Sequence, residues 1–119
     1  MSSKSRKWKF RIKHILDAIS DAQDYVQGIA LDEFMTDRKT IDAVIMKLAV
    51  IGEAVKYIPA SVQDSYPDIP WRKMQGLRNV LIHEYDRISL DVIWYVIQSD
   101  LPPLISPLTA IYERATDDE

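Results

Sequence analysis

The run of residues 78–85, RNVLIHEY, gathers side chains that could act on a phosphodiester bond. An imidazole with a pKa near neutrality can take a proton from a ribose 2′-hydroxyl or give one to a leaving 5′-oxygen. A guanidinium can hold a phosphate through two N–H groups and offset charge that develops on it. Arg78 and His83 are therefore candidate catalytic residues for metal-free RNA cleavage. Asn79 could orient the imidazole or contact the ribose, and Tyr85 could stack on a base or donate to a phosphate.

The same side chains also have a purely structural interpretation, which chemistry alone leaves open. Arg78 could pair with an acid, His83 could stabilise a helix C-terminus by its charge, and Tyr85 could cover the core. His14, the second histidine of the chain, lies at the edge of an apolar stripe and is expected to be inert. No histidine pair stands four residues apart and the acids are scattered, so neither a metal site nor a cofactor is predicted.

Helical spacing limits what a single chain can do with this motif. At about 100° per residue, Asn79 and His83 share a helix face, whereas Arg78 and His83 diverge by roughly 140° if the helix stays regular. Two copies related by a two-fold axis would solve this, because each chain could present its residues to a shared cleft. The spacing therefore favours a homodimer.

An amphipathic helix is predicted from about Trp8 to Gly28, because its apolar residues recur at spacings of three and four. These residues are Trp8, Ile12, Ile15, Ile19, Ala22, Val26 and Ile29. The following residues 31–34 are predicted to form a turn, and Thr36 is the expected cap of a second helix from about Asp37 to Ile58.

The second helix has two apolar faces, so it must be covered on both sides. One face carries Ile41, Val44, Leu48, Ile51, Val55 and Ile58, and the other carries Ala43, Met46, Val50, Ala54 and Tyr57. A second protomer could cover the second face. An interior position in a single bundle explains the pattern equally well.

Two further helices complete an all-α prediction, an antiparallel bundle with short connections. A third runs from Pro70 to about His83, since proline suits the first turn of a helix. Ser89 is a plausible cap for the last helix. Pro102, Pro103 and Pro107 each remove a backbone hydrogen bond, so that helix should kink near Leu101 or restart at Pro102.

Composition predicts one small soluble domain over residues 1–119. The chain has 47% apolar and 28% charged residues, no cysteine and a formal net charge of -3. Thiol chemistry and disulfides are excluded, and any contact with RNA must be local rather than spread over a basic surface. The basic segment of about residues 1–7 and the acidic end of about 116–119 are expected to be solvated tails. The absence of an apolar leader or span predicts a cytoplasmic protein without membrane contact.

The motif resembles the R-N-x-x-x-H-x-Y signature of HepT-like HEPN-domain proteins. The resemblance extends to Ile51-Gly52-Glu53-Ala54, to Ile69-Pro70-Trp71 and to Asp100-Leu101-Pro102-Pro103-Leu104, in the order and spacing of that family. It covers about residues 8–112.

This resemblance implies an antiparallel HEPN-like bundle, a homodimer, and a metal-independent endoribonuclease toxin that cleaves cellular RNA, either tRNA or mRNA. By position, Arg78 and His83 would be catalytic and Asn79 and Tyr85 supporting. It also implies a nucleotidyltransferase-fold (MNT) antitoxin that AMPylates Tyr85, in a toxin–antitoxin complex that could assemble beyond the dimer. The alternative is a non-enzymatic helical module that binds a nucleotide or a nucleotidyltransferase partner through the same residues.

Overall fold

A computed structural model describes residues 3–79 and 89–115 of the chain. Every regular element in these ranges is a helix, which confirms the all-α prediction. The elements are α1 (Ser3–Val26), α2 (Leu31–Thr36), α3 (Arg38–Val55), α4 (Ala60–Ser65), α5 (Trp71–Gln75), α7 (Leu90–Tyr95), the π-helical η2 (Val96–Asp100) and α8 (Pro102–Arg114). In this described part of the chain, no helix is both long and apolar enough to cross a bilayer.

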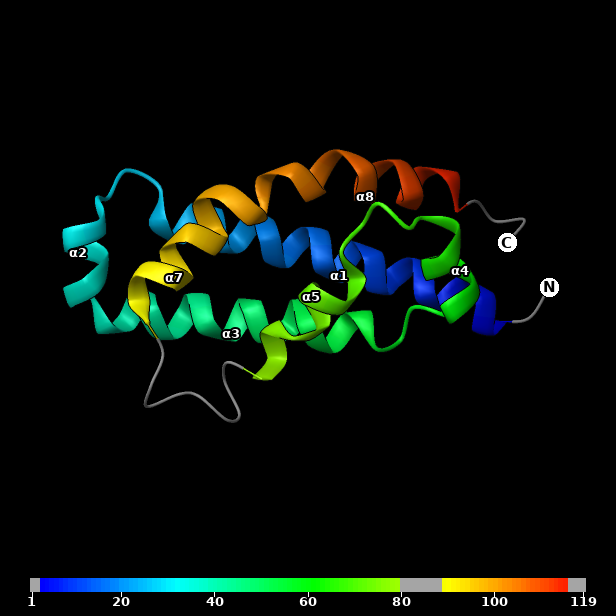
Figure 1. Cartoon of the computed structure of the whole chain (residues 1–119), viewed down its shortest axis with the longest axis horizontal. Helices are drawn as coiled ribbons and strands as arrows, with labels where there is room; N and C mark the ends of the chain where they lie inside the picture. The colour runs from blue at the N-terminus through cyan, green and yellow to red at the C-terminus, as the bar shows by residue number, and fades with distance from the viewer. Residues whose placement is uncertain (1–2, 80–88, 116–119) are drawn as a thin grey trace.

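The antiparallel bundle is formed by α1, by α3 and by the run from α7 through η2 to α8 (Figure 1). α1 packs along α3, which runs in the opposite direction, and α8 lies along another side of α1. The short helix α5 packs on α3, while α2 joins the far ends of α1 and α3 and contacts α7. The bundle therefore places α5 and Arg78 directly on α3.

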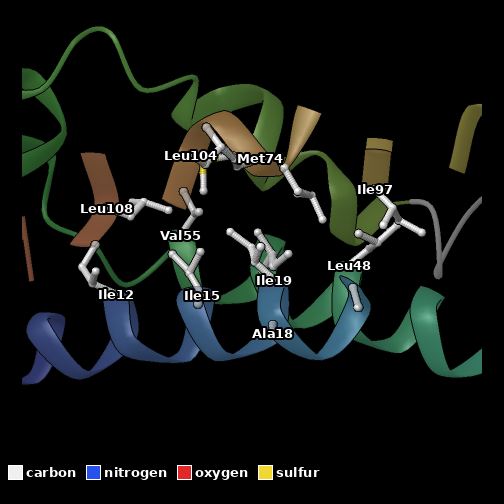
Figure 2. Close-up of a cluster of buried hydrophobic side chains, with 14 of the residues drawn as sticks. Ile12, Ile15, Ala18, Ile19, Leu48, Val55, Met74, Ile97, Leu104 and Leu108 are labelled. Carbon is white, nitrogen blue, oxygen red and sulfur yellow. The ribbon is translucent and has the colours of Figure 1, made fainter. Parts of the chain in front are cut away.

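The core lies between these helices, and the stripe predicted on α1 faces it. Ile12, Ile15 and Ile19 are fully buried, whereas Ile29, beyond the end of α1, is half-buried. Figure 2 shows side chains from α1, α3, α5, η2 and α8 converging on one another. Burying a large aliphatic side chain contributes about 1.5–3 kcal/mol, so this shared cluster is the main stabilising term.

The two apolar faces of α3 have different surroundings. The whole of the first face is buried, from Ile41 to Ile58. On the second face Ala54 is buried and Val50 half-buried, but Met46 and Tyr57 are exposed by 52% and 50%. A single chain therefore covers only part of the second face.

Two predicted boundaries near α2 were wrong. The predicted turn at residues 31–34 is helical, and the buried ring of Phe34 lies 5.3 Å from the ring of Trp94. Asp37, not Thr36, caps α3: its Oδ1 accepts a hydrogen bond of 3.1 Å from the backbone N–H of Thr40. A carboxylate there satisfies a backbone donor that the first helical turn leaves unpaired.

Other helix limits also differ from the predictions. α1 begins at Ser3 rather than Trp8 and ends at Val26, and α4 was not predicted. α3 ends at Val55 rather than Ile58, so Tyr57 and Ile58 lie in the turn that follows it. The helix expected from Pro70 to His83 is interrupted: α5 ends at Gln75, Gly76 forms a turn, and residues 77–79 are helical again. The rest of that predicted helix lies outside the described residues.

The last helix breaks where its prolines predict. The backbone N–H of Leu101 donates to the oxygen of Val96 at 2.9 Å, the wider pairing of a π-helical turn. α8 then starts at Pro102. The backbone N–H groups of the first helical turn have no acceptor within the helix, so the missing N–H of proline costs no hydrogen bond there. The predicted kink near Leu101 is thus confirmed.

Candidate active site

The backbone of Arg78 lies directly against α3, at Gly52. A Cβ atom at Gly52 would stand 2.5 Å from the Arg78 nitrogen and 2.8 Å from the oxygen of Gln75. Both distances are shorter than non-bonded atoms allow, and both neighbours are backbone atoms. Only glycine lets the two segments approach this closely.

Buried and polar contacts of α5 hold the segment that leads to Arg78. The side chains of Trp71 and Met74 are 6% and 2% exposed. The indole N–H of Trp71 donates to the backbone oxygen of Tyr66 at 3.0 Å. On the outer side, Lys73 Nζ lies 3.8 Å from a carboxylate oxygen of Asp100 in η2. Burial of Trp71 and Met74 and the indole hydrogen bond therefore hold α5, and the exposed ion pair of Lys73 adds little.

The side chain of Arg78 is paired with an acid of α3. Its Nε lies 2.7 Å from Glu53 Oε1, and Lys56 Nζ lies 3.8 Å from the same oxygen. Within the described residues, this buried oxygen accepts no hydrogen bond of regular geometry, so the contact with Arg78 is an ion pair rather than a linear hydrogen bond. The contact is made through Nε, and a guanidinium has two further N–H-bearing groups that can donate to a phosphate.

This ion pair orients Arg78 more than it stabilises the fold. The side chains of Arg78 and Glu53 are 42% and 38% exposed, and ion pairs in contact with water contribute little to stability. Pairing with an acid was also what the structural interpretation of the motif expected. The pair alone therefore does not separate a catalytic arginine from a structural one.

The structure describes only part of the predicted motif. Asn79 is exposed, and its backbone N–H donates to the oxygen of Gly76 at 3.0 Å. His83 and Tyr85 lie outside the described residues. The shared face of Asn79 and His83, and the roles of His83 and Tyr85, stay predictions.

A cavity of about 370 Å³ opens beside Arg78. Its lining comes from three separate segments of the chain: α1, α3 and the residues after Gly76. The lining residues are Arg11, His14, Met46, Ala49, Val50, Glu53, Ala54 and Arg78. The structure thus brings His14 to the same cavity as Arg78, a neighbourhood that the sequence analysis did not foresee.

Among the described residues, no three histidine or acidic side chains gather as a group that could hold a metal ion. Metal independence of the predicted reaction is a separate matter and stays a prediction.

The described residues form a small all-α bundle with Arg78 packed on α3, and comparison with known proteins gives the family. The sequence profile described as Ribonuclease HepT-like matches residues 15–111. The chain belongs to the ribonuclease HepT-like family, which confirms the resemblance drawn from the motif.

Curated relatives cover most of the chain. A candidate RNase of Methanocaldococcus jannaschii is 40% identical over 97 residues, which are 82% of this chain and 80% of that protein. A protein of Thermococcus cleftensis named probable ribonuclease HepT is 37% identical over 99 residues, 83% of this chain and 90% of its own length. A candidate RNase of Caldanaerobacter subterraneus is 31% identical over 103 residues, 87% and 92% of the two chains. No solved structure matches the chain.

Proposed function

We propose that this protein is a metal-independent endoribonuclease that acts as the toxin of a toxin–antitoxin pair. The observation that carries the proposal is the placement of Arg78: its backbone is packed on Gly52 and its Nε is paired with Glu53 at 2.7 Å, beside an open cavity. Membership of a ribonuclease family, with relatives named as ribonucleases, supports the reaction class.

The reaction needs a proton acceptor, a proton donor and a cation. The ribose 2′-oxygen attacks phosphorus, the bond from phosphorus to the 5′-oxygen breaks, and a 2′,3′-cyclic phosphate and a 5′-hydroxyl result. His83 takes the proton of the 2′-hydroxyl or returns one to the 5′-oxygen, while the amino groups of Arg78 stabilise the negative charge on the phosphate. Glu53 holds the guanidinium by Nε and is a positioning residue.

The first test removes each side chain in turn. His83→Ala and Arg78→Ala should each lower RNA cleavage by about 10²-fold or more, since they remove proton transfer and phosphate stabilisation. Circular dichroism should report unchanged helix content. Wild-type cleavage by either purified variant would exclude this assignment.

A second test concerns metal ions. Cleavage should persist in excess EDTA, because the proposed steps use only protein groups. Loss of cleavage in EDTA and its return with magnesium would contradict the mechanism.

The dimer is part of the proposal because Arg78 and His83 diverge by roughly 140° on a regular helix, so one chain alone places them poorly around a single phosphate. A partner protomer related by a two-fold axis could bring its own motif to the same cleft. Light scattering should give twice the monomer mass of 13.8 kDa at micromolar concentration. Mixing Arg78→Ala with His83→Ala chains would then show whether the two residues act within one chain or across the interface: recovery of activity in mixed dimers indicates a site drawn from both.

Control by an MNT-type antitoxin would act through Tyr85. AMP on this hydroxyl would add a bulky nucleoside and a negative phosphodiester, which could occupy Arg78 as a substrate phosphate would. Incubation with ATP and the cognate antitoxin should raise the intact mass by multiples of AMP in the wild type. The same increase in Tyr85→Phe would show that another residue is the acceptor.

Growth of the host separates the toxin from the non-enzymatic alternative. Expression of this chain alone should arrest growth, and His83→Ala should abolish the arrest. Arrest that survives His83→Ala would favour a module that acts by binding a nucleotide or a partner.

A further inference from the structure

The cavity beside Arg78 has a positively charged rim. Arg11 stands on α1 with its guanidinium 4.0 Å from the ring centre of Tyr57. The hydroxyl of Tyr57 donates to Glu53 Oε2 at 3.4 Å, and the other oxygen of Glu53 pairs with Arg78. Arg11 and Arg78 are thus linked across α3 through one tyrosine and one carboxylate.

The charged side chains around Glu53 carry a net positive charge. Arg11, Lys56 and Arg78 are cations, and Glu53 is the acid that contacts two of them. Arg11 rests on an aromatic face, a contact that leaves its charge in place. In a chain with a formal net charge of -3, this is the kind of local cationic site that binding to RNA requires.

The floor of the cavity is apolar. Ala49 and Ala54 are buried, Val50 is half-buried and Met46 is exposed. An apolar surface with a cationic rim fits a nucleotide, whose base is flat and apolar on its faces and whose phosphate is anionic. The volume of about 370 Å³ falls within the range of about 300–1,000 Å³ for ligand pockets.

We propose that this cavity is a binding subsite for a nucleotide of single-stranded RNA, next to the one whose phosphate Arg78 holds. The base lies on the floor formed by Met46 and Val50, Arg11 contacts the flanking phosphate, and the exposed imidazole of His14 reaches the edge of the base or the phosphate. This inference rests on the proposed ribonuclease function. It gives His14 a role in substrate binding and none in proton transfer.

Lys13 offers a matched control on the same helix. It neighbours His14 in sequence, yet its Nζ pairs with Asp17 at 2.8 Å and it is not part of the cavity lining. Lys13→Gln and Arg11→Gln each remove one positive charge from α1. Any general effect of net charge on RNA binding is therefore equal in the two variants.

Kinetics on two substrates test the subsite. On a longer single-stranded RNA, Arg11→Gln and His14→Gln should each raise KM by about tenfold, the loss expected for one charge-assisted contact, with kcat unchanged. A dinucleotide carries only the scissile phosphate and lacks the flanking phosphate, so on this substrate Arg11→Gln should match the wild type. Lys13→Gln should match it on both substrates. Equal losses in Arg11→Gln on the two substrates, or no loss on either, would overturn the proposal.

A binding experiment separates failure of the subsite from failure of the proposed reaction. The chain has two histidines, so His83→Ala leaves His14 as the one imidazole visible by NMR. Titration with short single-stranded RNA should shift the Cε1–H signal of His14 along the binding curve that fluorescence anisotropy gives. If this shift occurs while the wild type fails to cleave RNA, the ribonuclease proposal falls and the subsite stands.

The remaining outcomes overturn the subsite. RNA that binds without moving the His14 signal occupies another surface, and absence of binding removes the subsite altogether. A His14 signal that moves on dilution of the protein, but not with RNA, would show that a second copy of the chain covers the cavity.

Discussion

Two arginine–carboxylate pairs mark the two ends of α3, and their surroundings differ. At the start of the helix, Arg38 Nη1 lies 3.7 Å from Asp42 Oδ1, with side chains 73% and 50% exposed. At its end, Glu53 Oε1 lies 2.7 Å from Arg78 Nε, with side chains 38% and 42% exposed. The first pair spans one turn of a single helix, whereas the second joins two segments distant in sequence.

The difference between the two pairs shows when an ion pair can fix the direction of a side chain. Long side chains in water lose as much in rotamer freedom as they gain from a surface ion pair. Arg78 differs because its backbone is already fixed against Gly52, so the pair with Glu53 only has to choose a side-chain direction. Two changes at Gly52 and Glu53 should therefore affect function far more than changes at the start of α3.

The largest effect is expected for Gly52→Ala. Alanine in a helix interior is favoured over glycine by about 1 kcal/mol, but overpacking a tight contact costs roughly 1–3 kcal/mol. The steric cost should exceed the gain in helix propensity, because the added Cβ would meet backbone atoms of Arg78 and Gln75. Displacement of Arg78 by even about 1 Å can lower the rate by about 10²-fold. Thermal unfolding and RNA cleavage measure the two effects.

Gly28→Ala is the matched control. Gly28 has a φ of 81°, and a Cβ there would meet nothing within 4 Å. Strain of the left-handed backbone should cost about 1–2 kcal/mol, similar to the cost at Gly52. Cleavage per folded molecule should stay at the wild-type level. Equal loss of cleavage in both variants would mean that stability, not the position of Arg78, limits the rate.

A smaller effect is expected for Glu53→Gln. The amide keeps the shape of the side chain but loses the charge that draws the Arg78 guanidinium to it. We expect kcat to fall by about tenfold because Arg78 is less well oriented, while KM falls slightly because the cavity becomes more positive. Arg38→Gln removes the cation of the exposed pair at the other end of α3 and should change neither constant. An unchanged kcat in Glu53→Gln would show that Gly52 alone sets the position of Arg78.

The long-range architecture was predictable because it rests on helical periodicity. The stripe on α1 and the buried face of α3 follow from apolar residues repeated every three or four positions. The break at Leu101 follows from Pro102 and Pro103, which cannot donate backbone hydrogen bonds. The motif containing Arg78 was equally visible, because its residues lie close together in the sequence.

The missed features depend on contacts between distant segments. α2 is six residues long, and its one buried side chain, Phe34, packs near Trp94. The cavity draws its lining from three segments, so no local pattern marks His14 as a neighbour of Arg78. Gly52 could be read from the sequence as part of a family segment. Its physical reason, the backbone of Arg78 lying against it, is visible only in the fold.

The smallest effect is expected at the start of α3, where Asp37→Asn should change acid sensitivity alone. The hydroxyl and then the backbone N–H of Thr40 donate to the Asp37 carboxylate and hold its pKa below the ordinary value of 3.8. A group whose pKa is lowered by folding adds stability above its unfolded pKa, and this stability is lost as pH falls through the folded pKa. Asparagine caps a helix about as well as aspartate but does not titrate.

At neutral pH the Asp37→Asn variant should therefore melt close to the wild type. As the pH falls from above 3.8 through the lowered pKa of Asp37, the wild type should lose slightly more of its thermal stability than the variant. RNA cleavage at neutral pH should be the same in both, since Asp37 caps the end of α3 that does not carry Glu53. If the variant lost cleavage without losing stability, the start of α3 would also position the site. The contrast drawn here between the two ends of α3 would then be wrong.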